Sequence, residues 1–185
     1  MGNAAISGHF THEDFLVWEA TQKDKHEFVR GEVFAMVGAR RVHVGVTRNL
    51  TTLLTLHLKG SPCRAYASDM LVRVEAVDSD FYPDVVVTCD EADKVAERVL
   101  TSPTLLVEVL SEATEAFDRG GKFEAYRHIT TLREYVLIDP QRPSVECFRL
   151  NANQRWELHS FTAQSTIVFS SIEFTTSWAD VFADL

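Results

Sequence analysis

The sequence predicts an α/β fold of the mixed α+β kind, in which a central mixed sheet is flanked by helices. Short runs rich in valine, isoleucine and aromatic residues predict strands, and two longer segments with apolar residues every three or four positions predict helices. In the run at residues 105–110 only Glu108 is polar, which is typical of a strand covered on both faces. No repeat, low-complexity tract or linker interrupts residues 1–185, so we expect one domain.

The amino-terminal half is expected to alternate helices with short strands. Thr11 and Asp14 have the spacing of a helix cap, and Arg30-Gly31 separates two apolar runs as the tight turn of a hairpin does. Apolar residues recur at helical spacing until Lys59-Gly60-Ser61-Pro62, a composition that ends helices. The expected helices cover residues 12–20 and 41–59, and the expected strands cover residues 27–29, 32–36, 63–67, 70–74 and 85–88.

The carboxyl-terminal half is expected to contain one long helix and several strands. Asp139-Pro140 stops a strand, residues 151–154 form the turn of a hairpin, and Ser177 caps a terminal amphipathic helix. The expected strands cover residues 105–110, 134–138, 145–150, 155–161 and 167–169, and the expected helices cover residues 114–128 and 178–185.

Composition excludes several classes of protein. No apolar run approaches the roughly 18 residues that cross a membrane, and residues 1–12 lack the basic-then-apolar pattern of a signal peptide. The three cysteines, Cys63, Cys89 and Cys147, are odd in number and far apart, which suggests neither a disulfide framework nor a zinc site. We therefore expect a cytoplasmic protein.

Charge is distributed unevenly along the chain. The formal net charge is −9, which by itself argues against a general nucleic-acid binder. Residues 33–68, however, contain no acid and include Arg40, Arg41 and Arg48. This asymmetry allows a local phosphate-binding face on an acidic protein, although basic residues on solvated helix surfaces would give the same pattern.

Two carboxylates within apolar runs are the main chemical signal. Asp84 begins the run at residues 84–87, and Glu108 lies inside the run at residues 105–110. A buried carboxylate is costly unless it is paired, and hard cations such as Mg²⁺ or Mn²⁺ prefer carboxylate oxygens. If the two strands are neighbours, alternation brings both acids to one face and to one metal. The alternative is structural: Asp84 caps a turn after Pro83, and Glu108 pairs with a basic helix residue.

A family resemblance adds to this pattern. The residues that carry it are Glu32, Tyr82-Pro83-Asp84, Glu108-Val109-Leu110-Ser111, Asp118, Lys122, Tyr126, Glu134-Tyr135 and Asp139-Pro140. This combination resembles the Uma-type family of putative restriction endonucleases, within the PD-(D/E)XK nuclease superfamily, over most of the chain. The resemblance implies a restriction-endonuclease-like core, a metal such as magnesium, DNA as the partner and a single nuclease-like domain.

The resemblance also assigns roles to individual residues. Asp84 corresponds to the aspartate of the PD motif, and Glu108 corresponds to the acid of the (D/E)XK motif. Leu110 occupies the lysine position, which departs from the superfamily pattern and implies that Lys122 on the next helix replaces that lysine. Asp118 lies one turn before Lys122 and could orient it.

Other residues receive weaker assignments. Glu32 resembles an amino-terminal glutamate that many such nucleases add to the metal site, although an exposed hairpin acid would look the same. His43 could contact phosphate or assist proton transfer, because its unperturbed pKa lies near neutrality. Tyr126 is expected to pack beside the site.

Two hypotheses follow. The first is a metal-dependent endonuclease that hydrolyses DNA phosphodiester bonds, with Asp84 and Glu108 as metal ligands, Glu32 and Lys122 as further catalytic residues, and His43, Arg40, Arg41 and Arg48 facing the substrate. Cutting two strands with one small site would favour a homodimer. The second is a catalytically inactive nuclease fold retained as a binding module, which the missing lysine at position 110 and the net charge favour.

Overall fold

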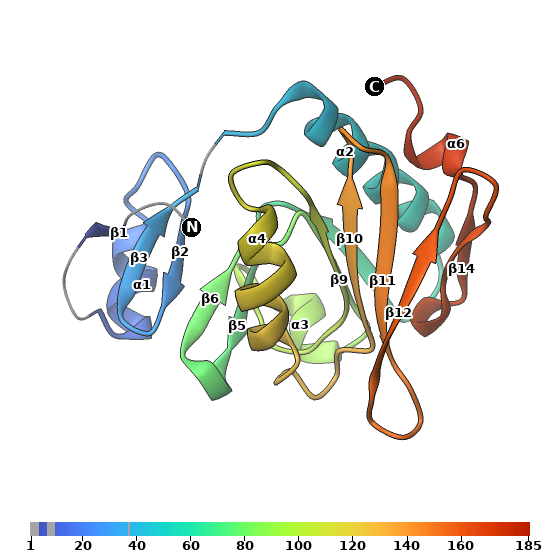
Figure 1. The fold of residues 1–185 in the computed structure, drawn as a ribbon. Helices are drawn as coiled ribbons and strands as arrows, with labels where there is room; N and C mark the ends of the chain where they lie inside the picture. Colours follow the sequence, from blue (N-terminus) through green and yellow to red (C-terminus); the bar gives the residue numbers. More distant parts are fainter. Residues whose placement is uncertain (1–3, 7–9, 37) are drawn as a thin grey trace.

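The computed structural model describes residues 4–6, 10–36 and 38–185, with the backbone alone for residues 4–6 (Figure 1). The strands of the described residues form two six-stranded sheets and one small hairpin. The first sheet has the order β1 (Ala4–Ile6), β3 (Glu32–Ala35), β2 (His26–Val29), β6 (Ser79–Phe81), β5 (Leu71–Val74) and β8 (Val99–Leu100). The second has the order β12 (Trp156–Phe161), β11 (Ser144–Leu150), β10 (Glu134–Asp139), β9 (Pro103–Val109), β7 (Val85–Thr88) and β4 (Arg64–Ala67). The hairpin is formed by β13 (Ile167–Phe169) and β14 (Phe174–Thr176).

Both large sheets are mixed. In the second sheet β9 and β10 are parallel, while β9 and β7 are antiparallel, as are β10 and β11. In the first sheet β5 and β8 are parallel, and β2 and β3 form an antiparallel hairpin. The predicted mixed α+β class is confirmed, although the strands divide between two sheets instead of joining one. Strand β9 is central in its sheet and buried, as its apolar sequence predicts.

Helices cover both faces of the second sheet. The α-helices are α1 (His12–Glu19), α2 (Arg41–His57), α3 (Glu91–Val95), α4 (Glu115–Phe117), α5 (Phe123–Tyr126) and α6 (Trp178–Val181). The apolar stripe of α2 packs on one face through Val46, Leu50 and Leu54. The segment from α4 to α5 packs on the other face, where Tyr126 lies in a core shared with Phe81 of the first sheet. None of the helices in the described part of the chain has both the length and the apolar character needed to cross a bilayer.

The helix expected at residues 114–128 is shorter and irregular. A π-helical segment, η2 (Asp118–Lys122), lies between α4 and α5. Single π-helical turns widen a helix locally and occur often at functional sites. Gly121 is needed here, because a Cβ at this position would lie 2.4 Å from the ring of Phe117. The wider turn carries Asp118 and Lys122, and both side chains are buried.

Local signals place most of the other elements correctly. Thr11 and Asp14 form a reciprocal capping box at α1, and Ser177 and Asp180 form a second one at α6. Arg30 and Gly31 have φ angles of 51° and 90°, as the tight turn of a hairpin requires. The terminal helix is a single turn, Trp178–Val181, and does not extend over the expected residues 178–185. The short strands β1, β6, β8 and β14 were not predicted, because strands of two or three residues leave little periodicity. The segment at residues 1–12, in which no signal-peptide pattern was found, includes residues 1–3 and 7–9, which lie outside the described residues.

The cysteine prediction was wrong for one pair. Cys63 and Cys89 form a disulfide, whereas Cys147 is free and buried. Cys63 precedes β4, and Cys89 follows β7. Because Arg64 lies opposite Thr88 in the antiparallel pair, the next step of the register brings the two cysteines together despite their separation in sequence.

Candidate active site

Asp84 and Glu108 meet across two neighbouring strands. Val85 of β7 lies opposite Val107 of β9, so one further step of the same register places Asp84 opposite Glu108. Directly opposite residues of an antiparallel pair have Cβ atoms roughly 5 Å apart. The Oδ2 atom of Asp84 accepts a hydrogen bond of 2.7 Å from the backbone N–H of Val109, which fixes this carboxylate against β9.

Lys122 reaches the same face of the sheet and lies among three carboxylates. Its Nζ atom is 2.8 Å from Oε1 of Glu27, 3.1 Å from Oε1 of Glu108 and 3.4 Å from Oδ1 of Asp118. All four residues are buried. They come from β2, β9 and the π-helical turn, so the two sheets and the irregular helix are joined at one point. We call these four residues the carboxylate–lysine cluster.

The cluster has mutually dependent charges. Burial raises the pKa of Glu108 well above its usual range, and the neighbouring Asp118, Asp84 and Glu27 act in the same direction against the opposing effect of Lys122. Burial alone would lower the pKa of Lys122, but Glu108, Glu27 and Asp118 outweigh it and hold that pKa well above its ordinary value. Lys122 therefore stays an ammonium, and its charge opposes the rise in the pKa of Glu108.

Tyrosine hydroxyls complete the surroundings of the cluster. The hydroxyl of Tyr126 donates a hydrogen bond of 3.0 Å to Oε1 of Glu108. The hydroxyl of Tyr135 donates one of 2.9 Å to the backbone carbonyl of Asp118. Tyr126 therefore does more than pack beside the site, because it holds one oxygen of Glu108 together with Lys122.

His43 links α2 to the pair of strand acids. Its Nε2 atom lies 3.2 Å from Oδ2 of Asp84, and both side chains are partly accessible. Burial tends to lower the pKa of His43, but the hydrogen bond and the charge of Asp84, with a smaller effect of Asp118, raise it above the ordinary value. The first turn of α2 thus brings His43 into contact with the carboxylate of Asp84.

Glu32, by contrast, lies outside the cluster. It is exposed at the start of β3, opposite Val29, and forms no ion pair or side-chain hydrogen bond within the described residues. Glu27, on the paired strand β2, contacts Lys122 instead. The structure therefore places Glu27, and not Glu32, beside Lys122, and the catalytic role of Glu32 stays a prediction. The same signal that identified Asp84 and Glu108, a carboxylate in an apolar run, is present in Glu27-Phe28-Val29 and could have found Glu27.

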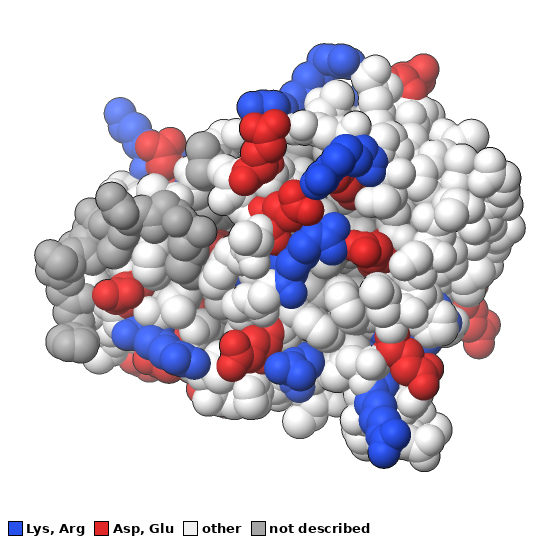
Figure 2. All heavy atoms as spheres, in the orientation of Figure 1, with Lys and Arg blue, Asp and Glu red and all other residues white. Residues whose placement is uncertain are grey.

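The predicted basic residues lie at the solvent-facing side of α2. Arg40, Arg41 and Arg48 are exposed, and Arg40 lies 3.7 Å from Glu112. Basic and acidic side chains are interspersed on the face shown in Figure 2. The arginines therefore lie on the helix that carries His43, within a surface of mixed charge.

The donor set of the site suits a hard divalent cation held by few protein ligands. No three His, Cys, Asp or Glu side chains of the described residues are grouped as a metal cage. Asp84 uses Oδ2 for its contacts and Glu108 uses Oε1, so the second oxygen of each makes no hydrogen bond within the described residues. Buried Oδ1 of Asp118 also lacks a hydrogen-bond partner there. Mg²⁺ commonly takes one or two carboxylates and completes its shell with water and phosphate oxygens.

A family model and two relatives match most of this chain. The family model described as Uma2, putative restriction endonuclease, matches residues 12–180. Two uncharacterized proteins of Synechocystis sp. are similar: slr1290 is 36% identical over 160 residues, covering 86% of this chain and 84% of the relative. The second, sll1609, is 33% identical over 167 residues, covering 89% and 92%.

A solved structure shares the fold. The crystal structure of a putative nuclease belonging to DUF820 from Anabaena variabilis ATCC 29413 has a TM-score of 0.77 and 18% sequence identity, and the match covers 94% of this chain and 98% of that one. At this identity the similarity concerns the fold alone. The family match, by contrast, spans the strands and helices that carry the candidate site, and the chain belongs to the Uma2 family of putative restriction endonucleases.

Proposed function

We propose that this chain is a divalent-metal-dependent endonuclease that hydrolyses phosphodiester bonds of DNA. The observation that carries the proposal is the register of β7 and β9, which sets Asp84 opposite Glu108, together with the contact of Lys122 to Glu108. In this proposal Lys122, beside Glu108, takes the place of the lysine that is missing at position 110. Leu110 itself is buried among apolar residues.

Each residue has a separate role in the proposal. Asp84 and Glu108 would hold the metal through the oxygens that are free of hydrogen bonds, and Lys122 would favour the charged form of Glu108 and offset negative charge on the phosphate. Glu27 holds Lys122 in place from the other sheet. His43 lies at the accessible side of Asp84, where it can contact a phosphate or accept a proton. When bound, Mg²⁺ or Mn²⁺ would lower the pKa of its water and neutralise charge on the scissile group.

DNA is the proposed substrate because of the family and the position of α2. His43 faces Asp84 from the first turn of this helix, and Arg40, Arg41 and Arg48 are exposed on it. Arginine side chains beside the site would contact backbone phosphates and give no sequence preference. Cleavage of both strands by one site in each chain would use a homodimer.

The test compares cleavage of plasmid and linear duplex DNA with Mg²⁺, with Mn²⁺ and with EDTA. We expect metal-dependent cleavage by the native chain and a loss of at least about 100-fold in Asp84→Asn and Glu108→Gln. Isothermal titration should show weaker Mg²⁺ binding in the same variants. Glu27→Gln should also lose activity, whereas Glu32→Gln, the matched control on the neighbouring strand, should retain it.

Two results would contradict the proposal. Equal background cleavage by the native chain and Asp84→Asn would rule out catalytic activity and favour an inactive nuclease fold that binds a partner. Full activity in Glu27→Gln together with loss of activity in Glu32→Gln would contradict the proposed role of the carboxylate–lysine cluster in cleavage.

A further inference from the structure

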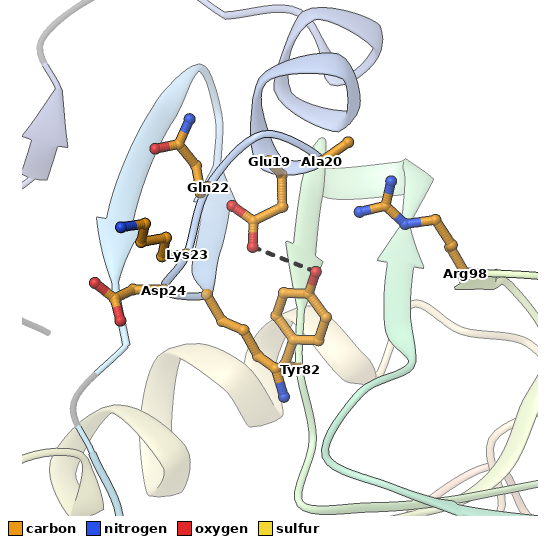
Figure 3. Close-up of a pocket in the computed structure, with 8 residues that line it drawn as sticks. Glu19, Ala20, Gln22, Lys23, Asp24, Tyr82 and Arg98 are labelled. Atoms are coloured by element: carbon orange, nitrogen blue, oxygen red, sulfur yellow. Dashed lines mark hydrogen bonds between the residues drawn. The ribbon is translucent and has the colours of Figure 1, made fainter.

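A polar cavity of about 310 Å³ lies beside the candidate active site (Figure 3). Its walls come from the end of α1, the residues that lead into β2, Tyr82 and Arg98. The backbone N–H of Tyr82 donates a hydrogen bond of 3.4 Å to Oε1 of Glu27, which also contacts Lys122. The cavity therefore shares a wall with the carboxylate–lysine cluster.

The spacing along the chain brings the cavity close to the cluster. Lys25 lines the cavity and lies two residues before Glu27, so an extended backbone separates the two positions by roughly 7 Å. On the other side, Tyr82 is joined through Pro83 to Asp84. A ligand in the cavity would thus lie next to whatever occupies the space between Asp84 and Glu108.

Three cations and two acids line the cavity. The acid Glu19 is already satisfied, because Oε1 accepts 2.9 Å from the backbone N–H of His26 and Oε2 lies 2.9 Å from Nδ1 of the same residue. Lys25 is also committed, since Nζ donates to the carbonyl of Ser68 at 2.7 Å and pairs with Asp69. The second acid, Asp24, is exposed.

The other two cations have no acidic partner. Within the described residues Lys23 and Arg98 form no ion pair, and the guanidinium of Arg98 lies close enough to the hydroxyl of Tyr82 to oppose the rise in its pKa. In Figure 3 Lys23 and Arg98 lie on opposite sides of Tyr82. Arg98 is anchored by its backbone, whose carbonyl accepts from the N–H of Leu71 at 2.9 Å. On a chain with a net charge of −9, two cations without an acidic partner in one cavity favour an anionic ligand.

We propose that this cavity binds a phosphodiester group of the nucleic-acid strand next to the scissile phosphate, with Arg98 and Lys23 as the groups that hold it. The inference rests on the proposed function and identifies a second point of contact for the same substrate. Arg98 can present paired N–H donors to phosphate oxygens, and Lys23 adds a mobile point charge.

The floor of the cavity fits a phosphate better than a base. Tyr82 is only 7% exposed, and Nζ of Lys25 stands 5.5 Å from the centre of its ring, so no ring face is free to stack on a base. Burial and the nearby Glu19 raise the pKa of Tyr82 to about 12, so its hydroxyl stays uncharged and does not repel an anion. Contacts of this kind position the strand and do not read sequence.

The test measures binding of a fluorescently labelled DNA duplex to the full chain in EDTA, where cleavage is absent, over a series of KCl concentrations. The association constant K falls with salt, and we expect Arg98→Gln to make the slope of log K against log salt less negative by roughly 0.9. The same variant should weaken binding about eightfold at 0.1 M salt. Lys23→Gln should act in the same direction, and Arg98→Lys should restore part of the loss. Lys59→Gln removes an exposed charge at the far end of α2 and is the matched control.

The outcomes separate this inference from the proposed function. Unchanged slopes in Arg98→Gln and Lys23→Gln, with cleavage intact in the native chain, would overturn the phosphate contact alone. An equal loss in Lys59→Gln would also overturn it, because the effect would then be one of net charge. Absence of DNA binding by the native chain would overturn both the phosphate contact and the proposed function. DNA binding without cleavage would overturn only the proposed catalytic activity.

Discussion

The two faces of strands β7 and β9 differ in what stabilises them. On one face Val85, Val87, Leu105 and Val107 are buried against α2 and the carboxyl-terminal segment. On the other face the same strands carry the opposed acids, covered by the π-helical turn with Lys122. Alternation along a strand therefore places an apolar core and a charged cluster back to back.

The difference shows which face can be altered without losing function. Aliphatic burial stabilises by roughly 25 cal/mol per Å² and depends on shape and volume, not on the identity of one partner. A buried ion group is different, because removal of one charge leaves its partners without compensation. The apolar face should accordingly determine stability, and the charged face should link stability to activity.

The largest effect is expected from the loss of Lys122. Lys122→Met leaves Glu27, Glu108 and Asp118 buried without their cation, which should lower the free energy of unfolding by about 3–5 kcal/mol at neutral pH. The pKa values of Glu108 and Asp118 are already raised by burial and would lose the opposing effect of Lys122, so both acids would take up protons on folding and the loss should shrink as the pH falls. Chemical denaturation at several pH values measures this, and cleavage assays should show no activity. A loss of stability that is the same at pH 5 and pH 8 would contradict the charge argument.

A similar loss of stability, without loss of chemistry, is expected on the apolar face. Leu105 is fully buried on β9, three residues before Glu108 and on the opposite side. Leu105→Ala should lower the free energy of unfolding by about 2–5 kcal/mol because it leaves a cavity. The rate of DNA cleavage per folded molecule should remain that of the native chain. If activity fell in proportion to that of Lys122→Met, the two faces would not be independent.

Sequence and structure agree best where a signal is local or periodic. The prediction that Asp84 and Glu108 share a face depended on β7 and β9 being neighbours, which the structure confirms, and the hairpin at Arg30-Gly31 follows from its turn residues. Glu27 lies in an apolar run of the same kind, but its contact with the cluster comes from the other sheet, and no periodicity along one chain segment reports a contact between sheets. Lys122 came from family resemblance alone, since the π-helical turn that buries it has no propensity signal.

A smaller effect is expected from Tyr126. Tyr126→Phe keeps the buried ring and removes the hydroxyl that donates to Glu108, so the free energy of unfolding should fall by about 1.5–3 kcal/mol. Glu108 would be held by Lys122 alone, and affinity for Mg²⁺ measured by calorimetry should change together with cleavage. Tyr135→Phe is the matched control, because its hydroxyl donates to a backbone carbonyl and not to an acid of the site. Equal metal affinity in both variants would assign Tyr126 to packing.

The smallest effect concerns pH and His43. The pKa of His43 in the folded chain is raised above 6.5, despite opposing burial, because Asp84 accepts from it and Asp118 lies nearby. The contribution of His43 to stability is therefore fully present below pH 6.5 and is lost as the pH rises through the folded pKa. The difference in unfolding free energy between the native chain and His43→Gln should decrease from pH 6 to pH 9. In an Asp84→Asn background this dependence should largely disappear, and a flat difference in the native background would contradict the pairing. Leu105→Ala should lose nearly the same stability at every pH in this range, because the substitution removes no group that titrates.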